Sequence, residues 1–302
     1  MNQTTLMPVT PPTLTPILGP ALAGVGSIPM PPEAPAGPIG APRLEPLDHE
    51  LLDFAASVLG DRVLQTVDGY RLPPGFKLSV VMPVYNERQT IGEIVRRVQA
   101  VELPKELIIV DDASTDGTRE MLAQLERQED VRVFYHSANR GKGAALRTGL
   151  AQALGDVVVV QDADLEYDPQ EYVRLIRPIV EGTADVVYGS RFLGGRAEHQ
   201  LLRHRLANAL LTRLSNFFTR LKLTDMETCH KVFRRSLLAG LELEQERFGI
   251  EPELTAKIAR RGARVVEVPI GYRARSQAEG KKIKLRDAFN ALYCIARYSL
   301  VD

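Results

Sequence analysis

Val157-Val-Val-Val-Gln-Asp-Ala-Asp-Leu-Glu166 is the stretch around which the rest of the chain is organised. Its run of β-branched residues indicates a buried parallel strand, and the carboxylates of Asp162, Asp164 and Glu166 follow that strand. Carboxylates crowded at a strand end repel one another, and a Mg²⁺ or Mn²⁺ ion would remove that cost. The stretch therefore predicts a metal–diphosphate site at the carboxyl edge of a sheet. A solvated acidic turn explains an isolated Asp-x-Asp equally well.

Strand and helix patterns alternate through the middle of the chain. Predicted strands cover 78–84, 107–112, 131–135, 157–161 and 185–188, and predicted helices cover 90–101, 116–128, 141–154 and 169–180. This alternation indicates an α/β fold with a mostly parallel sheet flanked by helices. A long apolar helical stripe over 202–221, a helix over 251–261, a strand over 265–268 and a final amphipathic helix over 284–300 follow.

The overall composition is that of an ordinary globular protein. The formal net charge is +0, so no global field favours nucleic acid and no such partner is expected. Cys229 and Cys294 are too few for a disulfide framework or a Cys-rich zinc site, which fits a reducing compartment. No apolar stretch reaches the roughly 18 residues of a spanning helix. We therefore expect a cytoplasmic protein, either soluble or peripheral on the cytoplasmic face of a membrane.

The amino-terminal part differs from the rest. Residues 1–46 hold 12 of the 20 prolines and predict a disordered tail. A secretory signal is disfavoured because the tail lacks a basic start and an unbroken apolar core. Residues 47–75 predict a short helix over 48–60 and a linker over 71–75, which leaves 76–302 as one α/β domain.

The first two predicted strands also end in polar groups, in Pro83-Val-Tyr-Asn-Glu87 and Asp111-Asp-Ala-Ser-Thr-Asp-Gly-Thr118. A carboxylate of the Asp111-Asp112 pair can accept a hydrogen bond from a base or a ribose hydroxyl, and Tyr85 can cover a base. Capping of the next helix is the competing explanation. It accounts for Asp116 but not for the paired aspartates.

The third predicted strand runs into Asn139-Arg-Gly-Lys-Gly143. Glycines and cations at the start of a helix predict a phosphate cradle, although Gly-Lys-Gly also suits any tight turn. The full G-x-x-x-x-G-K-[ST] spacing is missing, which disfavours a P-loop ATPase. The first strand is not followed by G-x-G-x-x-G, which disfavours a dinucleotide enzyme.

Residues 77–300 resemble the family 2 glycosyltransferases with the GT-A fold, and most of all the dolichol-phosphate mannose and polyprenyl-phosphate glucose synthases. Five blocks in order carry the resemblance: Val80-Val-Met-Pro-Val-Tyr-Asn-Glu87, Val110-Asp-Asp-Ala-Ser-Thr-Asp-Gly-Thr118, Asn139-Arg-Gly-Lys-Gly-Ala144, Gln161-Asp-Ala-Asp-Leu-Glu166 and Gly189-Ser-Arg-Phe192. The resemblance implies a metal-dependent, inverting transfer of mannose or glucose from a GDP- or UDP-sugar to a polyprenyl or dolichyl phosphate. Because that acceptor is already anionic, a strong general base is not required.

The resemblance also implies roles for individual residues. Asp162, Asp164 and Glu166 would hold the metal, although the synthases often carry a glutamine where Glu166 stands. Residues implied in catalysis are Asp164, Arg191 and Asp225. Residues implied in binding the nucleotide sugar are Pro83, Tyr85, Glu87, Asp111, Asp112, Lys142, Asp162, Ala163, Arg275, Lys281 and Lys282.

The acceptor would be bound by the later half of the chain. Arg191, Arg203 and Arg205 are candidates for the acceptor phosphate, because a lipid phosphate needs cations beside an apolar surface. A solvated basic face explains Arg203 and Arg205 equally well. The segment Thr224–Phe233 resembles the one that lines the sugar pocket, where Asp225 and Glu227 could bind hydroxyls or orient the acceptor.

Two features near the carboxyl end have competing explanations. The segment 275–282 resembles a flexible loop whose basic residues close over the donor diphosphate, and a solvated linker is the alternative. The final helix could lie on an anionic membrane surface, although packing on the domain is the favoured explanation.

Other functions remain open. Within the same family, the acceptor could be another molecule of cell-surface glycan synthesis. A non-catalytic nucleotide-sugar-binding scaffold, with the proline-rich tail docking a partner, is the alternative from a different class. A processive polysaccharide synthase is disfavoured because the chain has no tryptophan for the Gln-x-x-Arg-Trp motif of that group.

Overall fold

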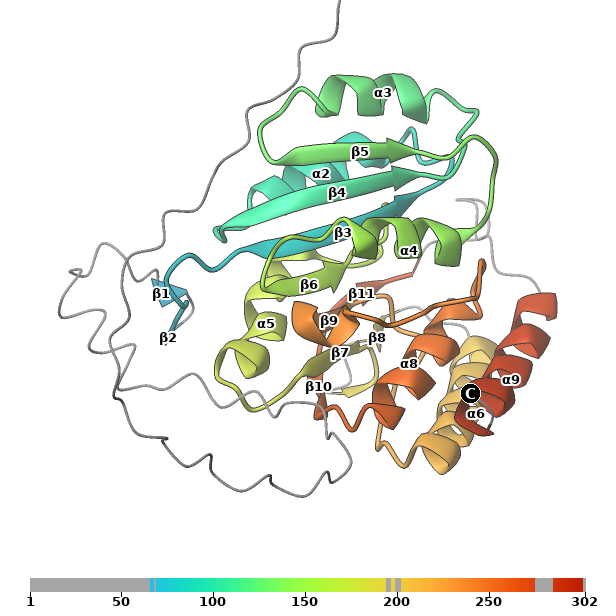
Figure 1. The fold of residues 1–302 in the computed structure, drawn as a ribbon. Helices are drawn as coiled ribbons and strands as arrows, with labels where there is room; N and C mark the ends of the chain where they lie inside the picture. The colour runs from blue at the N-terminus through green and yellow to red at the C-terminus, as the bar shows by residue number, and fades with distance from the viewer. Residues whose placement is uncertain (1–65, 68, 194–196, 199–201, 275–284, 301–302) are drawn as a thin grey trace, which may run out of the picture. The chain divides into compact units, whose positions relative to one another are not determined.

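The computed structural model describes residues 66–67, 69–193, 197–198, 202–274 and 285–300. They belong to one compact unit, Pro42–Asp302. A seven-stranded sheet with helices on both faces forms its centre, which confirms the predicted mostly parallel α/β fold (Figure 1). The predicted tail over 1–46 and the predicted helix over 48–60 lie outside the described residues.

The sheet has the order β10-β7-β9-β6-β3-β4-β5. Its strands are β3 (Leu78–Val84), β4 (Lys105–Asp111), β5 (Val131–Tyr135), β6 (Val157–Val160), β7 (Val186–Ser190), β9 (Lys231–Arg234) and β10 (Val265–Pro269). All neighbours are parallel except β9, which runs antiparallel between β6 and β7. The alternating pattern did not predict this reversal. Two small sheets pair β1 (Thr66–Val67) with β2 (Tyr70–Arg71) and β8 (Ala197–Glu198) with β11 (Tyr272–Arg273).

The described helices are α2 (Ile91–Gln99), α3 (Thr118–Leu125), α4 (Lys142–Ala151), η1 (Pro169–Glu171), α5 (Tyr172–Val180), α6 (Leu202–Thr219), α7 (Arg235–Leu238), α8 (Ile250–Arg260) and α9 (Leu285–Leu300). Several are shorter than predicted. In α3 the cause is local: Gly117 has a φ of 95°, a left-handed conformation that the helix cannot include. Asp116 still caps the helix in effect, because its Oδ1 accepts a hydrogen bond from the Thr118 amide at 3.0 Å.

The core is built on the apolar runs of the central strands. Val80, Ile108 and Val158 are completely buried, as expected for strands covered on both faces. Helix α4 lies close against β3, because a Cβ added at Gly149 would come within 2.4 Å of Val81 Cγ1. Leu72, in the predicted linker, is only 1% exposed, so the packed domain begins before residue 76.

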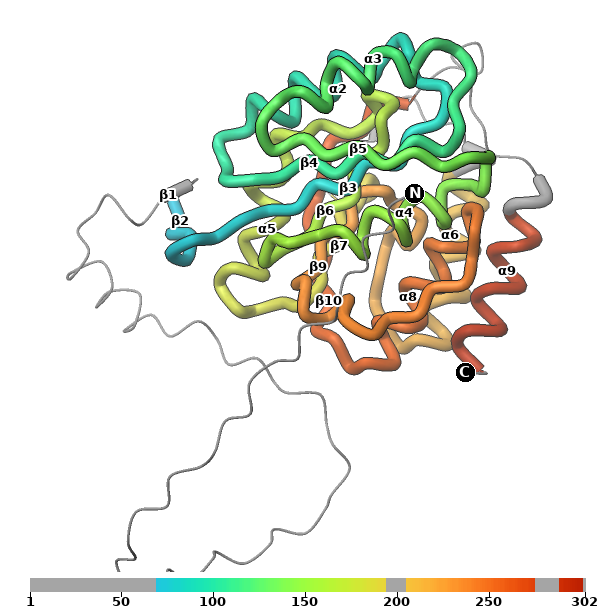
Figure 2. The backbone as a smooth tube through the Cα atoms, turned by 45° about the horizontal axis from the view of Figure 1, so that its top comes forward, coloured from blue at the N-terminus to red at the C-terminus, as the bar shows by residue number. Residues whose placement is uncertain are grey.

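The carboxyl ends of β3, β4, β5 and β6 all point to one side of the sheet, toward the right in Figure 1. Helices α6, α8 and α9 pack on one another at that side, with α9 outermost (Figure 2). Among the described helices, none is both long and apolar enough to cross a membrane.

Candidate functional site

The acidic stretch begins at a firmly held residue. Gln161 directly follows β6 and is completely buried. Its Oε1 accepts a hydrogen bond from the Tyr172 hydroxyl at 2.6 Å and lies 3.0 Å from His230 Nε2. These contacts from α5 and from the segment before β9 fix the point from which Asp162 leaves the sheet.

Asp162 is paired with a cation that comes from the start of α4. Lys142 Nζ lies 2.9 Å from Asp162 Oδ1 and 3.3 Å from Glu251 Oε1. Glu251 in turn pairs with the buried Lys231. Burial raises the pKa of Asp162, but the charge of Lys142 and the hydrogen bonds from Lys142 and Cys229 together outweigh burial, so the pKa lies below its usual value. The described structure therefore holds Asp162 ionised in a row of alternating charges.

Asp164 and Glu166 are arranged differently. Leu165 between them has a φ of 62°, which turns the chain sharply. Asp164 Oδ1 accepts a hydrogen bond from the Glu166 amide at 3.2 Å, and Glu166 Oε2 accepts one from the Tyr272 hydroxyl at 2.6 Å. Glu166, predicted as a third metal ligand, thus contacts β11.

The carboxylates nevertheless suit a divalent cation. Across the described ranges, no three His, Cys, Asp or Glu side chains are gathered as a ready metal site. Mg²⁺ commonly takes only one or two carboxylates and completes its shell with substrate phosphates and waters. Asp162 and Asp164, at one strand end, fit that donor set, with the remaining ligands supplied by a diphosphate.

Asp111 and Asp112, which were predicted to contact the base and ribose of the nucleotide, already have partners within the protein. Asp111 is completely buried, and its Oδ2 accepts hydrogen bonds from Arg119 Nε at 2.6 Å and from the Ser114 amide at 3.2 Å. Arg119 also donates to the carbonyl of His136. Asp111 therefore joins α3 to the ends of β4 and β5, and its oxygens face protein donors.

Asp112 has a similar role on the other side. Its carboxylate accepts hydrogen bonds from the amides of Arg140 at 2.9 Å and Gly141 at 2.6 Å. His136 Nδ1 lies 2.7 Å from Asp112 Oδ1. Neither His136 nor Arg119 was predicted from the sequence, because their contacts with the aspartates depend on how β5 and α3 are placed.

The other residues predicted to contact the nucleotide base lie at the same carboxyl edge of the sheet. Pro83 lies at the end of β3, and Tyr85 and Glu87 follow it. The amide of Asn86 donates to Ser114 Oγ at 2.9 Å, which ties this turn to the one after β4. The predicted neighbourhood of Pro83, Tyr85, Glu87 and Asp112 is thus compatible with the fold.

The segment predicted as a phosphate cradle lies close to protein oxygens. A Cβ added at Gly141 would come within 2.4 Å of the Glu246 carbonyl, and one at Gly143 within 2.3 Å of the Gln245 carbonyl. The Ala144 amide donates to the Glu246 carbonyl at 3.1 Å. The Gly141 and Ala144 amides therefore face protein oxygens, and the glycines permit the close approach of the 245–246 backbone. This packing agrees with the tight-turn explanation, and Lys142 faces Asp162.

Arg191 and Asp225, both predicted in catalysis, lie together. Arg191 Nε and Nη2 contact Asp225 Oδ2 and Oδ1 at 2.6 and 2.7 Å. The guanidinium also lies over the Tyr272 ring, 5.1 Å from its centroid. Desolvation lowers the pKa of Arg191, but contacts that include Asp225 raise it well above its usual value.

Glu227, two residues after Asp225, has a carboxylate oxygen without a hydrogen-bond partner among the described residues. That oxygen, Oε1, is buried. Burial, together with the charge of Glu251, raises the pKa of Glu227 to about 7. A carboxyl group with this pKa can exchange a proton near neutral pH.

The structure describes only some of the other residues that were predicted to bind the acceptor phosphate or the nucleotide sugar. Arg205 is exposed on α6, with its Cζ 6.0 Å from the centroid of Phe192, beside Arg191. Arg203 belongs to α6, but its side chain is outside the described set. Arg275, Lys281 and Lys282 also lie outside the described residues.

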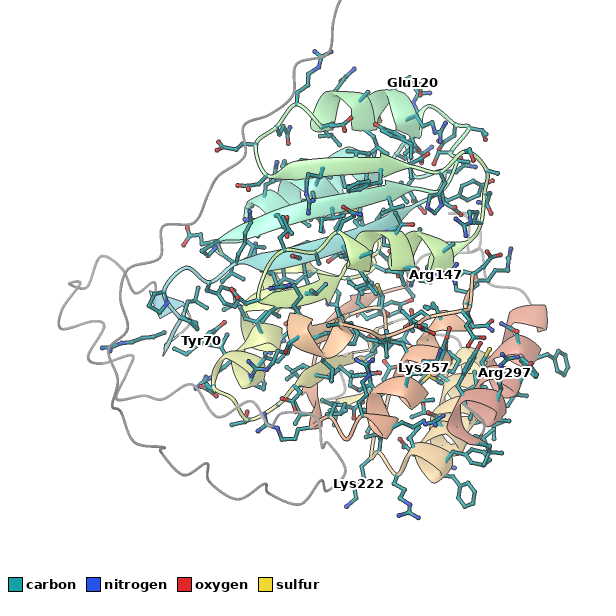
Figure 3. All side chains as sticks on the ribbon, in the orientation of Figure 1. Tyr70, Glu120, Arg147, Lys222, Lys257 and Arg297 are labelled. Carbon is teal, nitrogen blue, oxygen red and sulfur yellow. The ribbon has the colours of Figure 1, made fainter. Side chains whose placement is uncertain are left out.

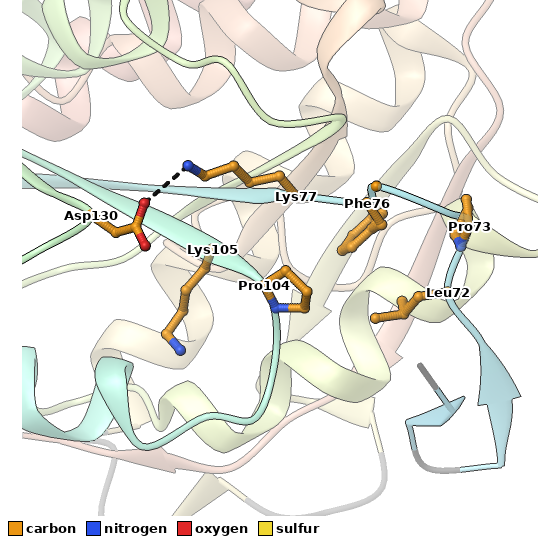
Figure 4. Close-up of a pocket in the computed structure, with 8 residues that line it drawn as sticks. Leu72, Pro73, Phe76, Lys77, Pro104, Lys105 and Asp130 are labelled. Carbon is orange, nitrogen blue, oxygen red and sulfur yellow. Dashed lines mark hydrogen bonds and ion pairs between the residues drawn. The ribbon is translucent and has the colours of Figure 1, made fainter. Parts of the chain in front are cut away.

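A separate pocket lies at the opposite edge of the sheet. It has a volume of about 380 Å³ and is lined by Leu72, Pro73, Gly75, Phe76, Lys77, Pro104, Lys105 and Asp130 (Figure 4). Lys77 and Pro104 immediately precede β3 and β4. The pocket is therefore at the amino ends of these strands, away from the acidic stretch, and is not part of the candidate site.

The chain belongs to glycosyl transferase family 2, whose family pattern matches residues 79–241. It is 32% identical over 227 residues to a dolichol-phosphate mannosyltransferase of Pyrococcus furiosus, covering 73% of this chain and 63% of that protein. It is 29% identical over 214 residues to an undecaprenyl-phosphate mannosyltransferase of Micrococcus luteus, covering 68% of this chain and 87% of that one.

Solved structures share the fold. The glucosyl-3-phosphoglycerate synthase of Mycobacterium tuberculosis, crystallised with Mn²⁺, UDP and glucosyl-3-phosphoglycerate, superposes with a TM-score of 0.57. The match covers 76% of this chain and 81% of that chain at 24% identity. This likeness confirms the predicted GT-A type of sheet.

Proposed function

We propose that the protein transfers a hexose, mannose or glucose, from a GDP- or UDP-sugar to a polyprenyl phosphate, with inversion and with a divalent cation. The observation that carries this proposal is the meeting of β3, β4 and β6 at one edge, where Tyr85, Asp112 and the acidic stretch come together. The named activities of the Pyrococcus furiosus and Micrococcus luteus relatives support the acceptor class.

The donor would lie across the strand ends. The cation, held by Asp162 and Asp164, would offset negative charge on the leaving nucleoside diphosphate. Lys142 adds positive charge beside Asp162. Tyr85 and the turn around Asp112 would contact the base and ribose.

The acceptor phosphate would approach from the side of Arg191 and α6. Arg191 is held in one orientation by Asp225 and Tyr272, with 12% of its side chain exposed. Arg205 is exposed over the neighbouring Phe192 ring and supplies a cation that no carboxylate of the described residues holds. Two guanidinium groups together suit a phosphate monoester.

A second candidate is transfer to an acceptor hydroxyl. Glu227 favours it, because a carboxyl group with a pKa of about 7 and an unpartnered buried oxygen suits a general base. A phosphate acceptor has no need of this base, so the two candidates make different demands on Glu227.

A donor and acceptor screen tests the proposal. UDP- and GDP-hexoses labelled in the sugar are supplied with Mn²⁺ or Mg²⁺ and either a short polyprenyl phosphate or 3-phosphoglycerate. We expect label in the lipid phosphate with one donor base, and turnover that survives Glu227→Gln. Label only in the hydroxyl acceptor, lost in Glu227→Gln, would establish the second candidate. No transfer with any donor would overturn both.

A further inference from the structure

Helix α6 buries three uncharged polar side chains and exposes three large apolar ones. Asn208 and Thr212 are 8% and 2% exposed, and Ser215 is also buried. Leu206, Leu210 and Phe217, by contrast, are 63%, 64% and 77% exposed. Their spacing places the apolar side chains along one side of the helix. A helix that packs only on its own domain normally has the opposite arrangement.

The inward polar face is built into the domain. Thr212 Oγ1 accepts a hydrogen bond from the Met226 amide at 3.1 Å, and Asn216 Nδ2 donates to the Leu223 carbonyl at 2.7 Å. These contacts hold α6 against the segment that leads to Asp225. The outward direction of the leucines is therefore fixed by hydrogen bonds on the other face.

Helix α9 also exposes large apolar side chains. It packs against α6 and buries Cys294 and Tyr298, while Phe289 and Leu300 are both 67% exposed and Tyr293 is 54% exposed. The two helices are neighbours in both views (Figures 1 and 2). We call Leu206, Leu210, Phe217, Phe289, Tyr293 and Leu300 the α6–α9 apolar set.

The charge around α6 selects the occupant. Residues 202–223 contain five cations and no acidic residue. Arg205, Arg213, Arg220 and Lys222 are exposed, and Lys222 projects outward beyond α6 in Figure 3. A second copy paired through α6 would bring these cations together without acidic partners, which disfavours a dimer. An apolar stripe flanked by arginines matches a helix that lies in the headgroup region of an anionic bilayer.

We propose that α6, together with α9, docks the domain on an anionic lipid surface. Leu206, Leu210 and Phe217 would enter the boundary between headgroups and acyl chains, and Arg213 and Lys222 would meet lipid phosphates. The inference rests on the proposed function for its purpose, since docking would present a polyprenyl phosphate beside Arg205. Docking itself depends only on the exposed apolar and basic side chains of α6 and α9.

Vesicle sedimentation of the full chain tests the docking. Wild type should sediment with phosphatidylcholine vesicles that contain phosphatidylglycerol, and much less with phosphatidylcholine alone or at high salt. Leu210→Glu/Phe217→Glu should weaken sedimentation by roughly tenfold or more, because each side chain loses its transfer from water. Leu154→Glu is the matched control: Leu154 is 67% exposed on the loop after α4 and should bind like wild type.

Three results would overturn the docking. The first is that wild type does not sediment with anionic vesicles. The second is that the α6 variant sediments as much as wild type and has an unchanged circular dichroism spectrum. The third is that wild type is a dimer that the α6 substitutions dissociate. Turnover of a short, water-dispersed polyprenyl phosphate separates this inference from the proposed function. The α6 variant should retain that turnover, whereas sedimentation of wild type without turnover of any donor would contradict only the proposed function.

Discussion

Arg191 and Asp225 form a bidentate ion pair between the end of β7 and the segment before β9. The contacts measure 2.6 and 2.7 Å, and the Asp225 side chain is completely buried. The Arg191 amide adds a third hydrogen bond to Asp225 Oδ2 at 3.1 Å. The two predicted catalytic residues therefore act as one unit, in which Asp225 holds the guanidinium in one orientation.

Removal of either partner should destabilise the fold. Arg191→Ala leaves a buried carboxylate without its cation and should lower the free energy of unfolding by about 3–5 kcal/mol. Asp225→Ala should have a similar effect. The double variant should lose clearly less than the sum, because the second change removes no further partner. Urea unfolding measures all three; additive losses would mean that the pair is not coupled.

Lys142 should compete with metal for Asp162. In Lys142→Met the ammonium that lies 2.9 Å from Asp162 Oδ1 is gone, so Mn²⁺ should bind the nucleotide-free protein several-fold more tightly. Titration followed by electron paramagnetic resonance reports free Mn²⁺. Lys77→Met, which removes a cation 3.1 Å from Asp130 at the opposite edge of the sheet, is the control and should bind Mn²⁺ like wild type. Equal binding by Lys142→Met and wild type would contradict the competition.

Glu227 should make the stability of the fold depend on pH. Its pKa is about 7 in the folded protein against a usual value of 4.5, so the folded state holds the proton more tightly. The stabilisation that comes from protonated Glu227 is fully present below its usual pKa of 4.5 and is lost as the pH rises through the folded-state pKa of about 7. Glu227→Gln should therefore be more stable than wild type by about 1–3 kcal/mol at pH 8, with the difference shrinking toward pH 5. Parallel stability curves would show that the Glu227 carboxyl titrates normally.

The close approach at Gly143 should not tolerate a side chain. A Cβ there meets the Gln245 carbonyl at 2.3 Å, so Gly143→Ala should cost about 1–3 kcal/mol and displace the start of α4. Gly92→Ala is the control: it lies inside α2, and its nearest neighbour, the Met121 Cε, is at 3.4 Å. That variant should match or exceed wild-type stability. Thermal unfolding compares the two, and an equal melting temperature for Gly143→Ala would contradict the packing.

The sequence predicted the strands and the edge at which polar groups gather, because continuous apolar runs such as Val157–Val160 have few alternatives in a parallel sheet. It did not predict the partners of those polar groups. Lys142 meets Glu251, and Asp111 meets Arg119, through elements placed by tertiary packing. The stripe of α6 was visible in the sequence, but an amphipathic pattern does not say which face turns inward. The buried Thr212 settles that direction.

The central claim is that Asp162 and Asp164 hold a cation that binds a nucleoside diphosphate. Calorimetric titration of UDP and GDP, with and without Mn²⁺, tests it on wild type, Asp164→Asn and Asp168→Asn. Asp168 is the control, because it lies in the same segment and its side chain accepts a hydrogen bond from the Gln170 amide at the start of η1. We predict that one nucleotide binds wild type and Asp168→Asn tightly only with Mn²⁺, and that Asp164→Asn loses about tenfold or more of that affinity. Nucleotide binding that is equally tight without Mn²⁺, or unchanged in Asp164→Asn, would contradict the claim.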